Sequence, residues 1–372
     1  MKYRQTQLTV GELATGQPLT VPIFEFKGRD SSAPAVFIQA NVHGAEVQGN
    51  AVIYQLMSML EQFDILGDIR LLPLANPLGI NQKSGEFTLG RFDPITGVNW
   101  NREYQAPLID IPKWVEAHKD LDSASFIQAY RATLIGICEE ALDNEWGLST
   151  GKRLALNLQA LALDSEIVLD LHTGPKSCKH LYCPEYDINA ARYFSIPYTL
   201  VMPNEFGGAM DESIFCPWWQ LSDYLQSQEI NFDIPMSAFT LELGSQEYVD
   251  LAEAKIDAKG ILAYLSHRGV IKDTVLPEQM PRYACYLKDY KKYHAPLSGL
   301  VEYKAPLGRV LPAGGVLANI LRLDLYGTEQ ALTPLSLEHT CVPLLHFASA
   351  SVHQGTELYK VMTQVFELSY LT

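Results

Sequence analysis

The sequence predicts an α/β fold followed by a small all-β region, and two observations carry this prediction. Up to about Pro277, apolar runs typical of buried strands alternate with helical patterns, as in strand–helix–strand units of an open sheet. After Pro277 the chain changes to short alternating segments broken by Gly and Pro, which is typical of a small β domain. At 372 residues the chain exceeds one typical domain of about 100–200 residues. We therefore expect two domains, at residues 1–277 and 278–372.

The first predicted unit is a strand, a helix and a second strand. The apolar run at 33–41 is bounded by serines and by a His-Gly pair, and the segment 45–63 has helical apolar spacing that ends before Gly67. A second apolar run follows at 69–76. Two parallel strands with a right-handed helical connection are the expected result.

Later elements follow from the same patterns. The segment 77–104 is rich in Gly, Asn and Pro and has little periodicity, which predicts a long surface loop of the kind that often has a function. Helices are expected at 123–146, 152–163, 211–228 and 250–268, and strands at 166–172, 181–183, 198–202 and 238–243.

Charge and composition exclude several classes of protein. The chain has 28 basic and 43 acidic residues, a net charge of -15, and no run of Lys or Arg, so we expect no nucleic-acid partner. No secretory signal and no apolar run of about 18 residues appears, which predicts a cytoplasmic protein without a membrane span. Because the global charge repels anions, capture of a carboxylate would depend on a few arginines in the 77–104 loop.

Residues of the types that bind metal ions follow or end two of the predicted strands. His43 and Glu46 follow the first buried run, and His172 ends the run EIVLDLH. Carboxyl ends of strands form the ligand-binding crevice of open α/β sheets. Two imidazole nitrogens and one carboxylate leave a fourth tetrahedral position for water, which is the pattern of a catalytic zinc site.

Five motifs in order give the chain a family resemblance. HGAE, NPLG, RxxPxxGxNWNR, LDLHTG and TLELGS, spread over about 36–265, resemble the succinylglutamate desuccinylase and aspartoacylase family of zinc-dependent, carboxypeptidase-like hydrolases. The resemblance implies an α/β fold with a mixed open sheet and helices on both faces. It also implies one zinc ion held by His43, Glu46 and His172, and Glu242 of TLELGS as the general base.

The same resemblance implies residues that bind substrate. Asn101 and Arg102 in NWNRE match the pair that holds the substrate carboxylate and carbonyl region, and Arg91 occupies the place of a second anion-binding arginine. The planar guanidinium suits a carboxylate because it binds it bidentately.

One position departs from the family pattern. Many relatives have Asp where this chain has Asn99, and that carboxylate would accept a hydrogen bond from a zinc-bound histidine. An amide oxygen can accept the same bond without adding charge, so it should make the ligand less basic. Asp170 lies two residues before His172, on the same strand face. Its carboxylate can compensate for the charge that Asn99 lacks.

The region after residue 277 resembles the β domain appended to this family, which is similar in pattern to biotinyl and lipoyl carrier domains. No lysine occupies a carrier-type turn, where the chain reads SLEHTC. We therefore expect no covalent cofactor there, and a role in gating the active site or in forming oligomers.

The predicted function is hydrolysis of the amide bond of a small N-acyl amino acid or related carboxylate. Two alternatives stay open: a metallocarboxypeptidase that acts on peptide C-termini, and a non-catalytic zinc-binding regulatory module. The expected partner is a small-molecule carboxylate, and a homo-oligomer is left open. The sequence does not define the acyl group, the amino acid, or the roles of the 110–150 and 204–235 segments.

Overall fold

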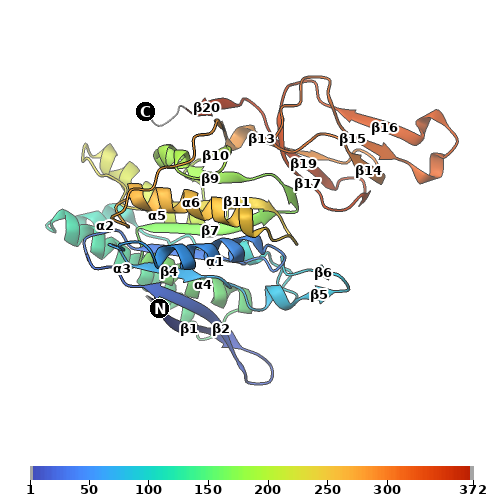
Figure 1. Ribbon diagram of the computed structural model, residues 1–372. Coiled ribbons are helices and arrows are strands. Elements are labelled where there is room, and N and C mark those ends of the chain that lie inside the picture. Colours follow the sequence, from blue (N-terminus) through green and yellow to red (C-terminus); the bar gives the residue numbers. More distant parts are fainter. Residues whose placement is uncertain (1–2, 369–372) are drawn as a thin grey trace.

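The computed structural model describes residues 3–368 and contains one large sheet (Figure 1). In spatial order its ten strands are β1 (Tyr3–Glu12), β2 (Pro18–Phe26), β4 (Ile69–Leu72), β3 (Val36–Ala40), β7 (Ile167–Gly174), β11 (Ser237–Ser245), β9 (His180–Pro184), β10 (Tyr198–Met202), β12 (Arg282–Tyr286) and β20 (Phe366–Leu368). The β1–β2 hairpin at one edge is an element that the sequence patterns did not reveal.

The strand directions are mixed. The central strands β4, β3, β7 and β11 are mutually parallel, whereas β9 runs antiparallel to β11 and parallel to β10 and β12. Every residue of β7 is buried, as expected of a parallel strand covered on both faces. The predicted fold class, a mixed open sheet with helices on both faces, is confirmed.

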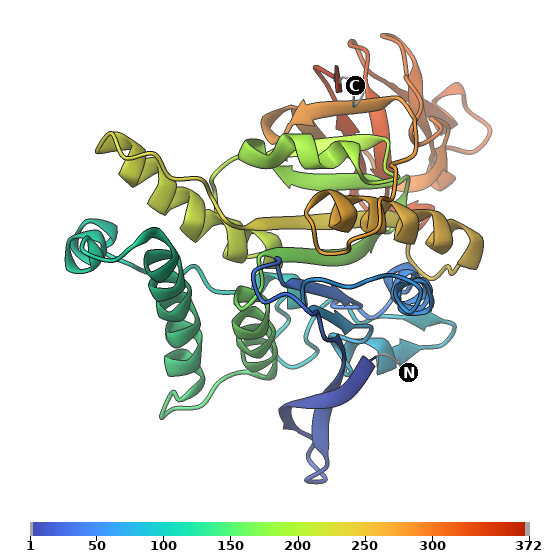
Figure 2. The same cartoon turned by 60° about the vertical axis from the view of Figure 1, so that its left-hand side comes forward.

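Helices cover both faces of the sheet, as Figure 2 shows. One face packs against α1 (Gln48–Leu60) and α6 (Leu251–His267), and the other against α3 (Ser123–Leu142), α4 (Thr150–Leu163) and α5 (Met210–Ser227), with α2 (Ile111–His118) beside them. Carboxylates begin two of these helices: Asp122 accepts a hydrogen bond from the Ser125 N–H, and Asp250 accepts from the N–H groups of Ala252 and Glu253.

The two segments that the sequence left without a role form part of the core. α3 packs on α4, and Trp218 in α5 is fully buried between them and the sheet. Trp218 therefore belongs to the hydrophobic core, and the partly buried Trp219 packs against it.

Two small antiparallel sheets make up most of the C-terminal region. One contains β13 (Tyr290–His294), β19 (Glu357–Met362), β17 (Val342–His346) and β8 (Lys176–Ser177), and the other contains β16 (Leu332–Ser336), β15 (Val316–Leu321), β14 (Gly299–Tyr303) and β18 (Ser351–Val352). The division of the chain at residues 277 and 278 stays a prediction, and strand pairing crosses it in both directions. β8 pairs with β17, whereas β12 and β20 join the large sheet.

The 77–104 segment is a long connection with little regular structure. It contains a two-stranded hairpin of β5 (Lys83–Ser84) and β6 (Phe87–Thr88) and two short 3₁₀ turns. Among residues 3–368, no helix has the length and apolar character needed to cross a bilayer.

Candidate active site

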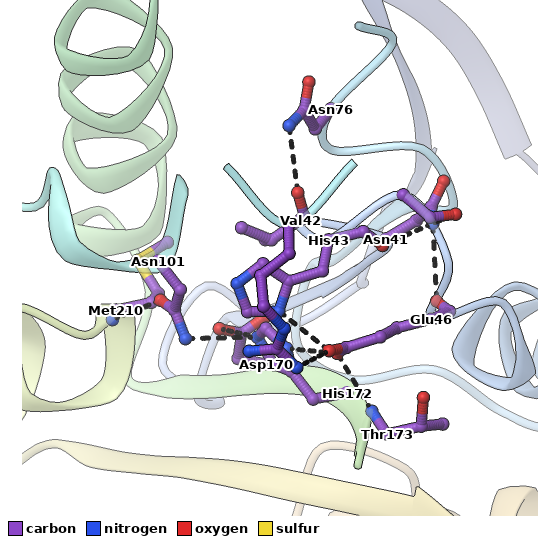
Figure 3. A network of polar contacts seen from close by, with 12 residues as sticks. Asn41, Val42, His43, Glu46, Asn76, Asn101, Asp170, His172, Thr173 and Met210 are labelled. Carbon is purple, nitrogen blue, oxygen red and sulfur yellow. Dashed lines mark hydrogen bonds and ion pairs between the residues drawn. The ribbon is translucent and has the colours of Figure 1, made fainter. Parts of the chain in front are cut away.

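Three predicted metal ligands converge where two central strands end. His43 and Glu46 lie in the turn between β3 and α1, and His172 lies in the neighbouring strand β7. The Nδ1 atoms of His43 and His172 lie 2.9 and 2.8 Å from the two carboxylate oxygens of Glu46 (Figure 3). All three residues are buried, and their donor atoms lie within 4.8 Å of one another.

The turn that carries His43 and Glu46 has an unusual backbone. Asn41 adopts a left-handed conformation with φ of 68°, and its side-chain amide donates to the carbonyl oxygens of His43 and Gly44. A Cβ atom at Gly44 would lie 2.1 Å from the carbonyl oxygen of Gly79, so only glycine fits there. This turn directs Glu46 toward His172. α1 therefore starts at Gln48, three residues later than the predicted start at residue 45.

The outer nitrogens of both histidines have acceptors. The Nε2–H group of His172 donates to Asp170 Oδ2 at 2.8 Å, and that of His43 donates to Asn99 Oδ1 at 2.7 Å. Asp170 also accepts a hydrogen bond from the amide of Gln39. These bonds orient both rings and favour the tautomer that leaves Nδ1 free to bind a metal.

This donor set fits a divalent metal ion. Two imidazole nitrogens and one carboxylate on three buried residues match the protein ligands of an open catalytic site. The chain therefore has a buried His43–Glu46–His172 group that could hold a metal.

Charge around the cluster favours an ionised Glu46. Burial raises the pKa of Glu46, but His43 and Arg91 oppose this effect and hold that pKa well below its usual value. Burial lowers the pKa of His172, whereas Asp170 more than offsets this and keeps it well above the usual value. Arg91 Nη2 lies 2.7 Å from Glu46 Oε1, so the expected anion-binding arginine is already paired with a predicted metal ligand.

Glu242 lies beside the cluster on the next strand. It is paired in register with His172 across β11 and β7, and the two side chains therefore point to the same face. Its Oε2 atom is buried and has no hydrogen-bond partner among residues 3–368. Burial, reinforced by the charge of Glu46, raises the pKa of Glu242 to about 7.

Asn101 and Arg102 border the same pocket. The Nδ2 atom of Asn101 lies 3.4 Å from His172 Nε2, and its Oδ1 atom accepts from the Met210 N–H at the start of α5. Arg102 donates to the carbonyl oxygen of Asn101. Within the part of the chain that the structure describes, Arg102 forms no ion pair, so its guanidinium is available to an anion.

The pocket has a volume of about 570 Å³ and two different walls. One wall comes from the α/β region, including the metal cluster, Glu242 and Arg102. The other comes from the C-terminal sheets and includes Leu287, Tyr290, Lys292, Leu345, Phe347, Glu357 and Lys360. The two lysines lie 3.8 and 3.4 Å from oxygens of Glu357. The expectation that positive charge near the site comes only from the 77–104 loop is therefore wrong, since Lys292 and Lys360 also line the pocket.

Sequence reasoning missed two groups of pocket residues. Thr240 and Tyr182 lie on the same face of the sheet as Glu242. The two-residue alternation before Glu242 was a usable signal for Thr240. Asp211 lies at the start of α5 and is 2% exposed. Nothing in its local sequence distinguishes it from a solvated helix-start carboxylate.

Comparisons with known proteins agree with this geometry. The chain matches the model of the succinylglutamate desuccinylase/aspartoacylase catalytic domain over residues 32–268. It is 67% identical to a Shewanella frigidimarina NCIMB 400 protein described with the same family name, with 100% of each chain covered and a TM-score of 0.98. A Shewanella amazonensis SB2B family protein is 63% identical over 98% of this chain and 100% of its own, with a TM-score of 0.96.

A more distant structure shares the fold. The product-bound ectoine utilization protein EutE from Ruegeria pomeroyi is 16% identical, with 97% of this chain and 95% of that chain covered and a TM-score of 0.66. No curated protein matches the chain.

Proposed function

The chain belongs to the succinylglutamate desuccinylase/aspartoacylase family, and from this premise we propose that it is a zinc-dependent hydrolase. Its proposed reaction is cleavage of the amide bond of a small N-acyl amino acid or related carboxylate in the cytoplasm. The observation that carries the proposal is the buried His43–Glu46–His172 group, which lines the same pocket as Glu242 and Arg102.

His43, Glu46 and His172 would hold one zinc ion through two Nδ1 atoms and a carboxylate. Bound there, zinc would acidify water and polarise the amide carbonyl. Asp170 and Asn99 keep the two imidazole rings in the orientation that this requires.

Glu242 is the proposed general base. Its carboxylate takes a proton from the attacking water and then gives that proton to the nitrogen of the leaving amine. Burial raises the pKa of this carboxyl above its ordinary value, which suits both halves of the transfer, because the group is then a stronger base and still a competent acid. Its pairing with His172, a proposed metal ligand, supports this role.

Arg102 and Asn101 are proposed to bind the substrate around the reacting amide. The unpaired guanidinium of Arg102 binds the carboxylate of the substrate. Asn101 accepts a hydrogen bond from the Met210 N–H at the start of α5 and lines the pocket beside His172. Arg91 holds Glu46 through one nitrogen, and its remaining N–H groups are available to the carbonyl oxygen as negative charge develops on it.

Metal analysis and a panel of substrates test the proposal. Zinc content of the purified protein is measured first, and kcat/KM is then compared for N-acetyl amino acids, N-succinyl amino acids and dipeptides. We expect about one zinc ion per chain and hydrolysis of an N-acyl amino acid. Glu242→Gln should retain zinc and lower kcat by about 10²- to 10⁴-fold, whereas Glu253→Gln, on the outer side of α6, should leave kcat unchanged.

Two results would contradict this function. Strong preference for dipeptides would indicate a metallocarboxypeptidase. Stoichiometric zinc without hydrolysis of any acylated amino acid would indicate a non-catalytic zinc-binding module.

A further inference from the structure

Asp211 is a buried carboxylate in the pocket that the proposed reaction does not use. It is 2% exposed and lines the same cavity as the metal cluster. Within the described part of the chain, no cationic side chain forms an ion pair with it. Buried carboxylates are normally paired with a cation, so the absence of a partner in a substrate pocket needs an explanation.

The position of Asp211 relative to the reacting groups follows from strand register. Asp170 and Thr240 are paired neighbours, as are His172 and Glu242 two residues further along the same strands. A hydrogen bond with Thr240 lowers the pKa of Asp211, which links Asp211 to the first of these rows. Two residues of a strand span roughly 6.6 Å. Asp211 therefore contacts the row next to the one that contains His172 and Glu242.

The surroundings of Asp211 suit a short apolar chain with a positive end. Met202 and Ala209 line the same cavity, and both are buried. Burial raises the pKa of Asp211 to about 7, and the charges of Glu212 and Asp170 add to this effect. With this pKa the carboxyl is only partly ionised at neutral pH, and a ligand cation beside it would favour the ionised form.

Helix capping does not account for Asp211. The side chain of Glu212 accepts hydrogen bonds from the N–H groups of Gly207 and Ala209, which precede α5. Asp211 accepts one backbone bond, at 3.0 Å, from its own neighbour Glu212. A solvated residue could serve that purpose, so capping alone gives no reason to bury a carboxylate in the cavity.

We propose that Asp211 determines specificity by binding the cationic side chain of the amino-acid part of the substrate. The substrate class is then an N-acyl derivative of a diamino acid or of a guanidino amino acid. Arg102 binds the α-carboxylate and Asp211 binds the ammonium or guanidinium group, so an unpaired guanidinium and an unpaired carboxyl of the pocket gain partners together. This inference rests on the proposed hydrolase function.

A substrate series tests the inference. kcat/KM is measured with Nα-acetyl-lysine, Nα-acetyl-ornithine, N-acetyl-norleucine and N-acetyl-glutamate. The wild-type protein should prefer the better cationic substrate over norleucine by about tenfold or more, and glutamate should be the poorest. Asp211→Asn should lower kcat/KM for that cationic substrate by about 10- to 100-fold and change the norleucine value by less than about threefold.

A matched control separates contact from helix effects. Asp122→Asn removes a carboxylate from the start of α3, outside the pocket, and should leave the ratio of lysine to norleucine unchanged. A preference for N-acetyl-glutamate, or an equal loss for all substrates in Asp211→Asn, would overturn the inference.

A second variant and a binding measurement keep the test decisive if Asp211→Asn lowers the melting temperature of the protein. Asp211→Glu keeps the charge but extends it by one methylene, so the preference should move from lysine toward the shorter ornithine; an unchanged ratio would overturn the inference. Calorimetry of free lysine and norleucine with zinc-loaded Glu242→Gln protein gives a readout that needs no hydrolysis. Selective lysine binding that Asp211→Asn abolishes would support the subsite even where no substrate is cleaved, and equal binding of both amino acids would refute it.

Discussion

The two walls of the pocket differ in how firmly their charged groups are held. On the α/β wall, His43, Glu46 and His172 are 5%, 1% and 3% exposed, and each has hydrogen-bonding partners on both sides. On the C-terminal wall, the side chains of Lys292 and Lys360 are 59% and 24% exposed and share one carboxylate, Glu357. Exposed pairs of this kind contribute about 0–1 kcal/mol each.

The difference separates two tasks. Groups that must keep one geometry for bond cleavage are fixed on strand ends of the large sheet, where burial strengthens their electrostatic interactions. Groups on the C-terminal wall can change rotamer at little cost and adapt to a ligand. We therefore expect changes on the α/β wall to alter metal binding and kcat, and changes on the C-terminal wall to alter the local field and KM.

Removal of a proposed metal ligand should show the contrast most strongly. His172→Ala removes one nitrogen from a three-residue set, so metal content should fall to near zero and kcat/KM should drop by about 10³-fold or more. Lys360→Met on the opposite wall should retain the full metal content. Elemental analysis after dialysis against a weak chelator checks both, and metal loss in Lys360→Met would contradict the proposed division between the walls.

The outer hydrogen bonds of the two histidines should give the next largest effect. Asp170→Asn removes the charge that supports His172, and metal affinity should weaken by about 10- to 100-fold. Asn99→Asp adds charge beside His43 and should tighten metal binding by up to about tenfold. Competition titration with a metal indicator measures both. Equal affinities in wild type and Asn99→Asp would show that the outer acceptor does not tune this site.

The pH dependence of kcat/KM should follow the pKa of Glu242 and the effect of charges on the C-terminal wall on that pKa. A base works only when deprotonated, so kcat/KM should rise with pH and level off above the pKa. Burial raises that pKa from the ordinary value of 4.5 to about 7, and a bound cation lowers it, so the midpoint should lie between these values. Lys360 also lowers this pKa, and Lys360→Met should therefore move the midpoint upward by about 0.2 to 0.5 pH unit.

Lys304→Met, directly after β14 and outside the pocket lining, is the control for this shift. An unchanged midpoint in Lys360→Met, or an equal shift in both variants, would mean that the C-terminal wall does not act on the base.

Salt should have the smallest effect. The net charge of -15 repels an anionic substrate at long range, while Arg102 attracts it locally, and screening weakens both effects. Raising salt from about 50 to about 300 mM should change kcat/KM by less than about twofold. A steep fall would show that long-range attraction by the exposed lysines dominates substrate capture.

The sequence predicted the α/β wall better than the C-terminal wall, for physical reasons. His43, Glu46, His172 and Glu242 end or follow strongly apolar strands, and strand ends meet at one edge of a sheet. Their convergence could therefore be predicted from local patterns. The mixed strand direction was predicted from the family resemblance, because a short apolar run does not indicate whether its strand is parallel or antiparallel to its neighbours.

The remaining features depend on long-range contacts. Lys292 and Lys360 reach the pocket only because β13 and β19 pair with each other beside the large sheet, and neither lysine has a distinctive local motif. Asp211 resembles any acidic residue of a first helical turn until its burial is known. β1 is mostly exposed or half-buried along its length, so it lacks an apolar pattern, whereas the alternating buried Leu19, Val21 and Ile23 of β2 were a usable signal.

The pairing of β12 with β20 has a consequence for biosynthesis. The chain leaves the large sheet after β12, forms the two small sheets, and returns with β20 to the same edge. During translation β20 can therefore dock only after the segment between Tyr286 and Phe366 has been synthesised. Until then β12 presents an open edge to other nascent chains. A truncation before Phe366 would consequently remove an edge strand of the large sheet.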